Sequence, residues 1–92
     1  MIHRAPLAVL LVGLALPLAA HAGPIETACR ASDRPGASWA LCRCIDSVAD
    51  QMLTRAEQRR VARFFRDPDL AQQVRASNNA TDSAFWQRYR AF

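Results

Sequence analysis

The sequence has 92 residues, 12 basic against 8 acidic side chains for a formal net charge of +4, and three cysteines, and all of its basic side chains are arginine. This length suits one small domain and leaves no room for a multidomain enzyme. The positive excess is mild. It favours anionic neighbours such as acidic proteins or phospholipid headgroups. We predict no nucleic-acid partner, because an exported protein rarely meets nucleic acid.

The N-terminal segment, residues 1–22, is typical of a signal peptide. A short polar start precedes an apolar run from Leu7 to Leu18, and Ala20-His21-Ala22 then offers a small-residue cleavage site before Gly23. The run is about a dozen residues, too short to cross a hydrocarbon layer of about 30 Å as a helix. We therefore expect cleavage, after which residues 23–92 form a single small helical domain. Such a protein is periplasmic or secreted and is not an integral membrane protein.

No segment alternates apolar and polar residues over the length of a strand, so every predicted element is a helix. Pro24 suits the first position of a short helix over residues 24–31, which the turn residues 33–36 end. Ser38 is a good cap for a second helix to about residue 53. Apolar residues recur along that helix at spacings of four, three and four, the strongest periodic signal in the chain: Leu41, Ile45, Val48 and Met52.

Three further helices follow. Thr54 and Glu57 form a capping box, in which each side chain accepts from the other residue's backbone amide, so a third helix runs to about Arg66. Asp67-Pro68 marks the start of a fourth helix that ends near residue 77. Thr81 or Asp82 is the expected cap of a fifth.

The fold class predicted is all-α, a small bundle of four to five short amphipathic helices stapled by a disulfide. Helices this short are marginal in isolation, so one shared core must hold them together. The expected core consists of Leu41, Ile45, Val48, Met52, Val61, Phe64, Phe65, Leu70, Val74, Phe85 and Tyr89.

The three cysteines are Cys29, Cys42 and Cys44. If the apolar stripe of the second helix faces the core, Cys42 projects about 90° to one side and Cys44 about 70° to the other. These two side chains diverge, so neither can bond to the other within a helix. Cys29 can bridge either one, which closes a loop worth about 3 kcal/mol. We favour Cys29 with Cys44, which sits nearer the expected core, and Cys29 with Cys42 is the alternative.

The leftover cysteine raises two alternatives to a purely structural role. One is a metal-binding or thiol-redox protein that uses Cys42 and Cys44. The familiar C-x-x-C spacing is absent, however, and both histidines lie in the signal segment, so we predict no metal site and no cofactor. The other is a covalent homodimer through the odd cysteine.

Three segments carry a family resemblance: CRCI, LTRAEQRRVARFFRDPDLAQQVRASN and DSAFWQRYRAF. Together they resemble a family of short exported alphaproteobacterial proteins that carry the automatic label "arginine transporter". The resemblance covers nearly all of residues 23–92. One cleaved helix and about 70 further residues cannot form a translocation path, so the resemblance implies at most an accessory role beside a transport system.

Two surfaces are candidates for binding a partner. The first is a basic ridge on the third helix, whose arginines recur at spacings of four, four and three: Arg55, Arg59, Arg63 and Arg66. It suits binding to an unknown envelope protein or an anionic surface, although a helix face that is only exposed to water has the same pattern. The second is the rim of the fifth helix, with Trp86 and Arg88 as candidate binding residues, where an arginine can stack on the tryptophan. Packing at the domain edge would explain the same residues.

No catalytic constellation is present. Outside the signal segment there is no histidine, and the chain contains no nucleophile elbow and no phosphate loop. We predict no enzymatic activity and no catalytic residue. The first function hypothesis is therefore a binding or accessory protein of another envelope component.

Overall fold

The structure is a computed structural model that describes residues 22–92. The predicted signal peptide lies outside this range except for its last residue, Ala22. Five helices and no strand occur within the range: α1 (Pro24–Ala31), α2 (Trp39–Met52), α3 (Arg55–Arg66), α4 (Asp69–Ala76) and α5 (Ala80–Ala91). The all-α prediction is confirmed. None of these helices is long and apolar enough to span a membrane.

The helix starts follow from local side-chain caps. The Ser38 hydroxyl accepts from the Leu41 amide at 3.1 Å. Both bonds of the capping box form, with Thr54 accepting from the Glu57 amide at 3.2 Å and Glu57 from the Thr54 amide at 2.9 Å. The predicted cap of α5 was wrong: Asn79 caps it, because its side-chain oxygen accepts from two successive backbone amides of the first turn.

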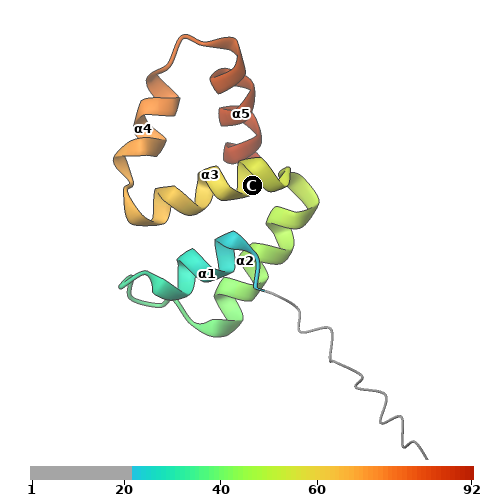
Figure 1. Cartoon of the computed structure of the whole chain (residues 1–92), viewed down its shortest axis with the longest axis vertical. Coiled ribbons are helices and arrows are strands. Elements are labelled where there is room, and N and C mark those ends of the chain that lie inside the picture. Colours follow the sequence, from blue (N-terminus) through green and yellow to red (C-terminus); the bar gives the residue numbers. More distant parts are fainter. Residues whose placement is uncertain (1–21) are drawn as a thin grey trace, which may run out of the picture.

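Helix α3 is the central element of the fold. It crosses the middle of the molecule, with α1 and α2 on one side and α4 and α5 on the other (Figure 1). Helix α1 packs against both α2 and α3, and α4 packs against α3 and α5. Because α3 is shared by both halves, its sequence must serve two packing faces and still leave an outer face in water.

One apolar core runs through both halves of the molecule. Its most buried members come from all five helices and the α2–α3 junction: Ile25, Ala49, Leu53, Val61, Phe64, Ala71, Val74 and Phe85. An aromatic cluster closes the α3–α5 side, where the rings of Phe64 and Tyr89 meet edge to face with centroids 5.3 Å apart. Such pairs add about 0.5–1.5 kcal/mol beyond the area they bury.

Helix α2 buries a different face from the one its apolar periodicity predicts. Leu41 is 46% exposed and Met52 36% exposed, whereas Cys42 and Ala49 are fully buried. The buried face is therefore rotated by about 80° toward Cys42. The physical reason is α1, which was not included in the predicted core. The Cα atoms of Cys29 on α1 and Cys42 on α2 are 5.5 Å apart, and this close approach favours cysteine and alanine on the buried face of α2 over leucine and methionine.

Candidate functional site

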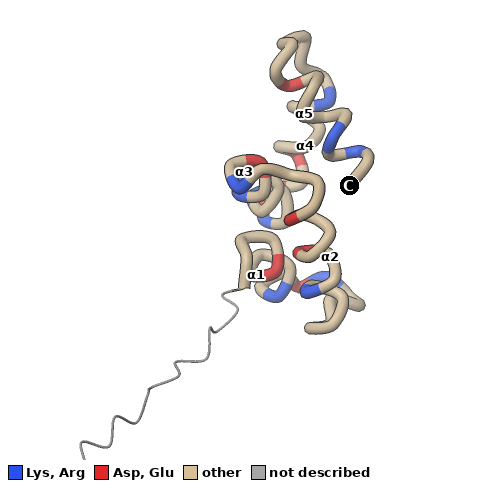
Figure 2. Tube along the Cα trace, turned by 90° about the vertical axis from the view of Figure 1, so that its right-hand side faces the viewer, with Lys and Arg blue, Asp and Glu red and all other residues tan. Residues whose placement is uncertain are grey.

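The basic ridge lies on the outer face of α3. Its four arginines are all exposed, while the inward residues Val61 and Phe64 are buried. The capping box fixes where α3 begins, and Glu57 in its first turn and Arg63 and Arg66 in its last turn suit the helix dipole. Figure 2 colours the basic positions blue, and some of them lie on the trace around α3. The structure therefore places the four predicted ridge residues on one exposed face of α3: Arg55, Arg59, Arg63 and Arg66.

The ridge arginines have no acidic partner among residues 22–92. The three ion pairs in this part of the chain involve other arginines: Arg30 with Glu26, Arg60 with Asp82 and Arg88 with Glu57. Arg55 donates only a long hydrogen bond, 3.4 Å, to the Gln58 side-chain oxygen. Four guanidinium groups on one helix thus keep their donors available for an external acceptor.

Two of the ion pairs tie α5 to α3. The Arg60 guanidinium lies 2.8 Å from Asp82 and 4.6 Å from the centroid of the Phe85 ring. The hydrogen bond from Arg60, with a second from Ser77, holds the pKa of Asp82 below its ordinary value. Burial opposes ionisation of Glu57, but hydrogen bonds from Thr54 and Arg88 outweigh it and lower the pKa of that carboxyl. These two carboxylates are therefore engaged within the fold.

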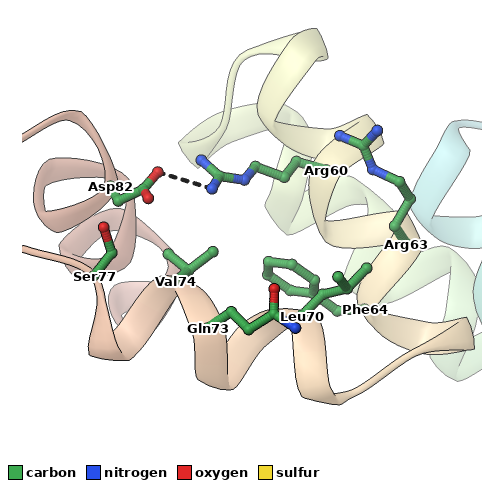
Figure 3. Close-up of a pocket in the computed structure, with 8 residues that line it drawn as sticks. All are labelled: Arg60, Arg63, Phe64, Leu70, Gln73, Val74, Ser77 and Asp82. Carbon is green, nitrogen blue, oxygen red and sulfur yellow. Dashed lines mark hydrogen bonds and ion pairs between the residues drawn. The ribbon is translucent and has the colours of Figure 1, made fainter. Parts of the chain in front are cut away.

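A hollow of about 520 Å³ lies between α3, α4 and α5 (Figure 3). Phe64, Leu70 and Val74 supply apolar lining, and the Arg60–Asp82 pair crosses one side. Arg63 belongs both to this hollow and to the ridge. Its guanidinium lies apart from Asp82 in the close-up, so it extends the basic surface to the edge of the hollow.

The second predicted surface is arranged differently. Trp86 is only half-buried and packs against Tyr89, with ring centroids 5.3 Å apart. Arg88 is bound to Glu57 on α3 at 2.6 Å, and none of the cation–π pairs among the described residues involves Trp86. The exposed tryptophan is Trp39, 70% exposed, with the Arg30 guanidinium 3.7 Å from its ring centroid. Sequence reasoning missed this pair because the partners come from different helices.

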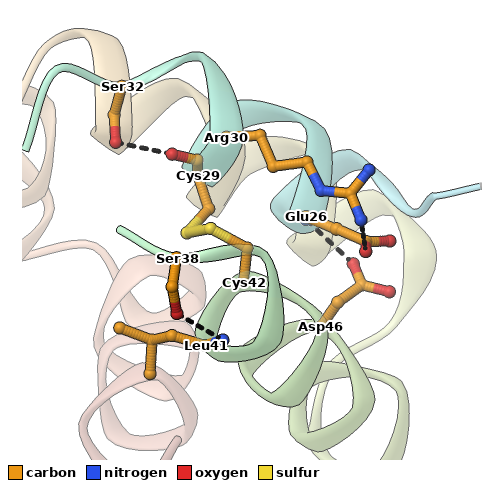
Figure 4. The surroundings of a disulfide bond; sticks show 8 residues. All are labelled: Glu26, Cys29, Arg30, Ser32, Ser38, Leu41, Cys42 and Asp46. Atoms are coloured by element: carbon orange, nitrogen blue, oxygen red, sulfur yellow. Dashed lines mark hydrogen bonds and ion pairs between the residues drawn. A yellow bond between two sulfur atoms is a disulfide. The ribbon is translucent and has the colours of Figure 1, made fainter. Parts of the chain in front are cut away.

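The disulfide joins Cys29 to Cys42, with Cα atoms 5.5 Å apart (Figure 4). The favoured pairing of Cys29 with Cys44 was therefore wrong, and the alternative is the one formed. The reason is the rotated face of α2, which points Cys42 at α1 and leaves Cys44 exposed and unpaired. Around the bond, Ser32 donates to the Cys29 carbonyl at 2.6 Å and closes the end of α1.

The disulfide also limits what the cysteines can do together. Cys42 is held in the bond, so only Cys44 remains as a thiol. Within residues 22–92 no group of three or more histidine, cysteine or acidic side chains is placed to hold a metal ion. Cys44 is exposed and lies beside Val48, about 40° further around the helix from Leu41.

Comparison of the chain with protein-family models, with curated proteins and with solved structures found no match. The assignment of a function therefore depends on the residues themselves.

Proposed function

We propose that this chain is a small non-enzymatic binding protein of the cell envelope that docks on an acidic surface of another envelope component. The observation that carries the proposal is the basic ridge, four exposed arginines with no acidic partner among residues 22–92. The signal segment expected at the N-terminus supports the location. The family resemblance supports an accessory role, with a transport system as one candidate partner.

The geometry of the ridge suits a carboxylate-bearing protein. From Arg55 to Arg66 the helix rises about 16 Å. Guanidinium groups at this spacing can each bind a carboxylate through two parallel hydrogen bonds, which fixes orientation as well as adding affinity. An acidic protein surface offers such a fixed row of acceptors. Anionic lipid headgroups offer a mobile one and are the second kind of surface that the ridge fits.

The uses of the acidic residues support a binding role over catalysis. Asp46 caps α1 through the Glu26 amide at 3.1 Å, and Asp50 accepts from Gln58 at 3.1 Å. Glu57 and Asp82 hold arginines. A metal or thiol-redox role for Cys42 and Cys44 remains the alternative, and it would require reduction of the Cys29–Cys42 bond before both thiols could act.

The ridge is tested by charge reversal at its centre. The variant Arg59→Glu with Arg63→Glu should retain its helicity but co-purify with envelope components about tenfold less, since two exposed ion pairs of about 0.5–1 kcal/mol each are replaced by repulsion. The matched control, Arg75→Glu with Arg90→Glu, changes the same net charge at exposed positions on α4 and α5.

The measurement is crosslinking in intact cells that express tagged full-length chain, followed by quantitative mass spectrometry. The proposal is supported if the ridge variant loses its crosslinked partners and the control variant retains them. Equal recovery of the same partners by both variants contradicts it. Binding of purified protein to vesicles with and without phosphatidylglycerol separates the lipid surface from the protein surface.

A further inference from the structure

The N-terminus of α1 lies against a carboxylate of α2. Gly23 is buried, and a methyl group on it would be 2.7 Å from Oδ2 of Asp46 and closer still to Oδ1. The backbone nitrogen of a residue lies about 2.5 Å from its methyl position, so the Gly23 nitrogen is within about 5 Å of this carboxylate. Only glycine allows the approach without displacing Asp46.

Asp46 is half-buried and has no cationic partner within ion-pair distance in the described part of the chain. Its Oδ1 accepts from the Glu26 amide at 3.1 Å (Figure 4). The nearby Arg30 is taken by Glu26 at 2.6 Å. A half-buried carboxylate in this position still lacks a counter-charge.

The surroundings of Asp46 also have an excess of negative charge. A hollow of about 470 Å³ there is lined by five charged side chains from α1 and α2: Glu26, Arg30, Arg43, Asp46 and Asp50. Three carboxylates face two guanidinium groups, a net charge of −1. One added cation would neutralise the hollow.

We propose that the missing cation is the chain's own α-ammonium group, created by cleavage between Ala22 and Gly23, and that Asp46 is its built-in binding site. Water adds across this peptide bond, so that Ala22 leaves with a carboxylate and the Gly23 nitrogen takes up a proton. This inference is independent of the basic ridge and rests on the cleavage that the sequence predicts.

Because of the helix dipole, Asp46 should decide whether the new positive charge stabilises or destabilises the fold. A positive charge at the N-terminus of α1 is unfavourable on its own, by about 0.3–1 kcal/mol. A partly buried carboxylate within about 5 Å attracts it more strongly than the dipole repels it, since the effective dielectric there is below that of water. With Asp46 present the new charge stabilises the fold. Without Asp46 the same charge destabilises it.

The chain provides a specific way to remove this charge. All 12 basic side chains are arginine, so the processed protein contains one primary amine, at Gly23. The protein is expressed from its full-length gene, exported, purified, checked by intact mass and acetylated with an N-hydroxysuccinimide ester. The Tm is then compared before and after acetylation for the wild type, for Asp46→Asn and for the matched control Asp50→Asn, which removes a charge from the same hollow.

Acetylation should lower the Tm of the wild type and of Asp50→Asn by about 4–8 °C, and should raise the Tm of Asp46→Asn. Asparagine can still accept from the Glu26 amide, so Asp46→Asn retains the helix cap. A second readout is the pKa of the α-amine, from the pH dependence of the acylation rate. It should lie above the ordinary value of about 7.7–8.0 in the wild type and fall in Asp46→Asn.

An equal Tm change in the wild type and Asp46→Asn would overturn the inference, and so would a mature protein that does not begin at Gly23. Neither result bears on the arginine ridge, whose test uses α3 variants only. Failure of one proposal therefore leaves the other standing.

Discussion

Individual acidic residues decide which arginines remain available. Glu57 reaches Arg88 on α5, and Asp82 reaches Arg60 on α3, so each carboxylate joins two helices that are distant in sequence. Such partly exposed pairs contribute little individually. Their larger effect is on function, since these two acids pair with Arg60 and Arg88 and so leave the ridge arginines without an acidic partner.

The two pairs predict a specific acid sensitivity. Both carboxyl groups have a pKa below their ordinary values of 4.5 for Glu57 and 3.8 for Asp82, so their stabilisation is complete above those values and is lost as the pH falls through the lowered ones. The variant Glu57→Gln with Asp82→Asn should melt below the wild type at pH 7. The two curves should converge near pH 2, measured by circular dichroism.

The control for this experiment is Asp33→Asn, in the exposed segment between α1 and α2. It should follow the wild type at every pH. A difference in Tm between the wild type and the double variant that stays constant down to pH 2 would show that the carboxylate charge is not what stabilises these contacts.

Among the elements, the α2–α3 junction has the most specific contact. Gln58 is 3% exposed, and its side-chain amide donates to the carbonyls of Ala49 and Leu53 and to Asp50. The two carbonyls belong to the last turn of α2 and its cap. The Ala49 carbonyl also accepts from the Leu53 amide at 2.8 Å, whereas the donor at the Leu53 carbonyl is Gln58. One side chain of α3 thus closes the end of α2.

Gln58→Ala should lower the free energy of unfolding by about 2 kcal/mol, because the buried Leu53 carbonyl loses its donor. The measurement is urea unfolding, with Gln72→Ala on the exposed side of α4 as the matched control. A loss below 0.5 kcal/mol, with the control unchanged, would mean that water replaces the amide at this carbonyl.

At this scale the sequence predicts helix ends better than helix faces. The caps at Ser38 and Thr54 depend on residues at most three positions away, so their spacing reveals them directly. The buried face of α2 depends instead on α1, which docks from elsewhere in the chain. Periodicity therefore pointed to Leu41 and Met52, which are exposed. The choice of disulfide failed for the same reason, while the exposed ridge needs no partner within the fold and was predictable from spacing.

The whole molecule is a small fold held by a shared core and one covalent link. A domain of about 70 residues buries only about 60% of its unfolded surface. The Cys29–Cys42 bond therefore supplies a large share of the net stability, since its 13-residue separation corresponds to about 3 kcal/mol of lost loop entropy in the unfolded chain.

Replacing both bonded cysteines by alanine should therefore cost about 3 kcal/mol in denaturant unfolding. Cys44→Ala should cost almost nothing, because Cys44 is exposed and outside the bond. Thiol titration of the denatured protein should find one thiol before reduction and three after it. If Cys44→Ala destabilised the fold as much as the double variant did, the assigned pairing would be wrong.

The docking of α1 on both α2 and α3 has a consequence for the order of events during synthesis. Cys29, Cys42 and Cys44 all emerge before any residue of α3. Until α3 follows, only the α1–α2 contacts, such as the hydrogen bond from the Glu26 amide to Asp46, direct Cys29 toward Cys42 rather than Cys44. The packing of α1 on α3 adds to this preference later, and a chain that has bonded Cys29 to Cys44 before then must exchange that bond before it can mature.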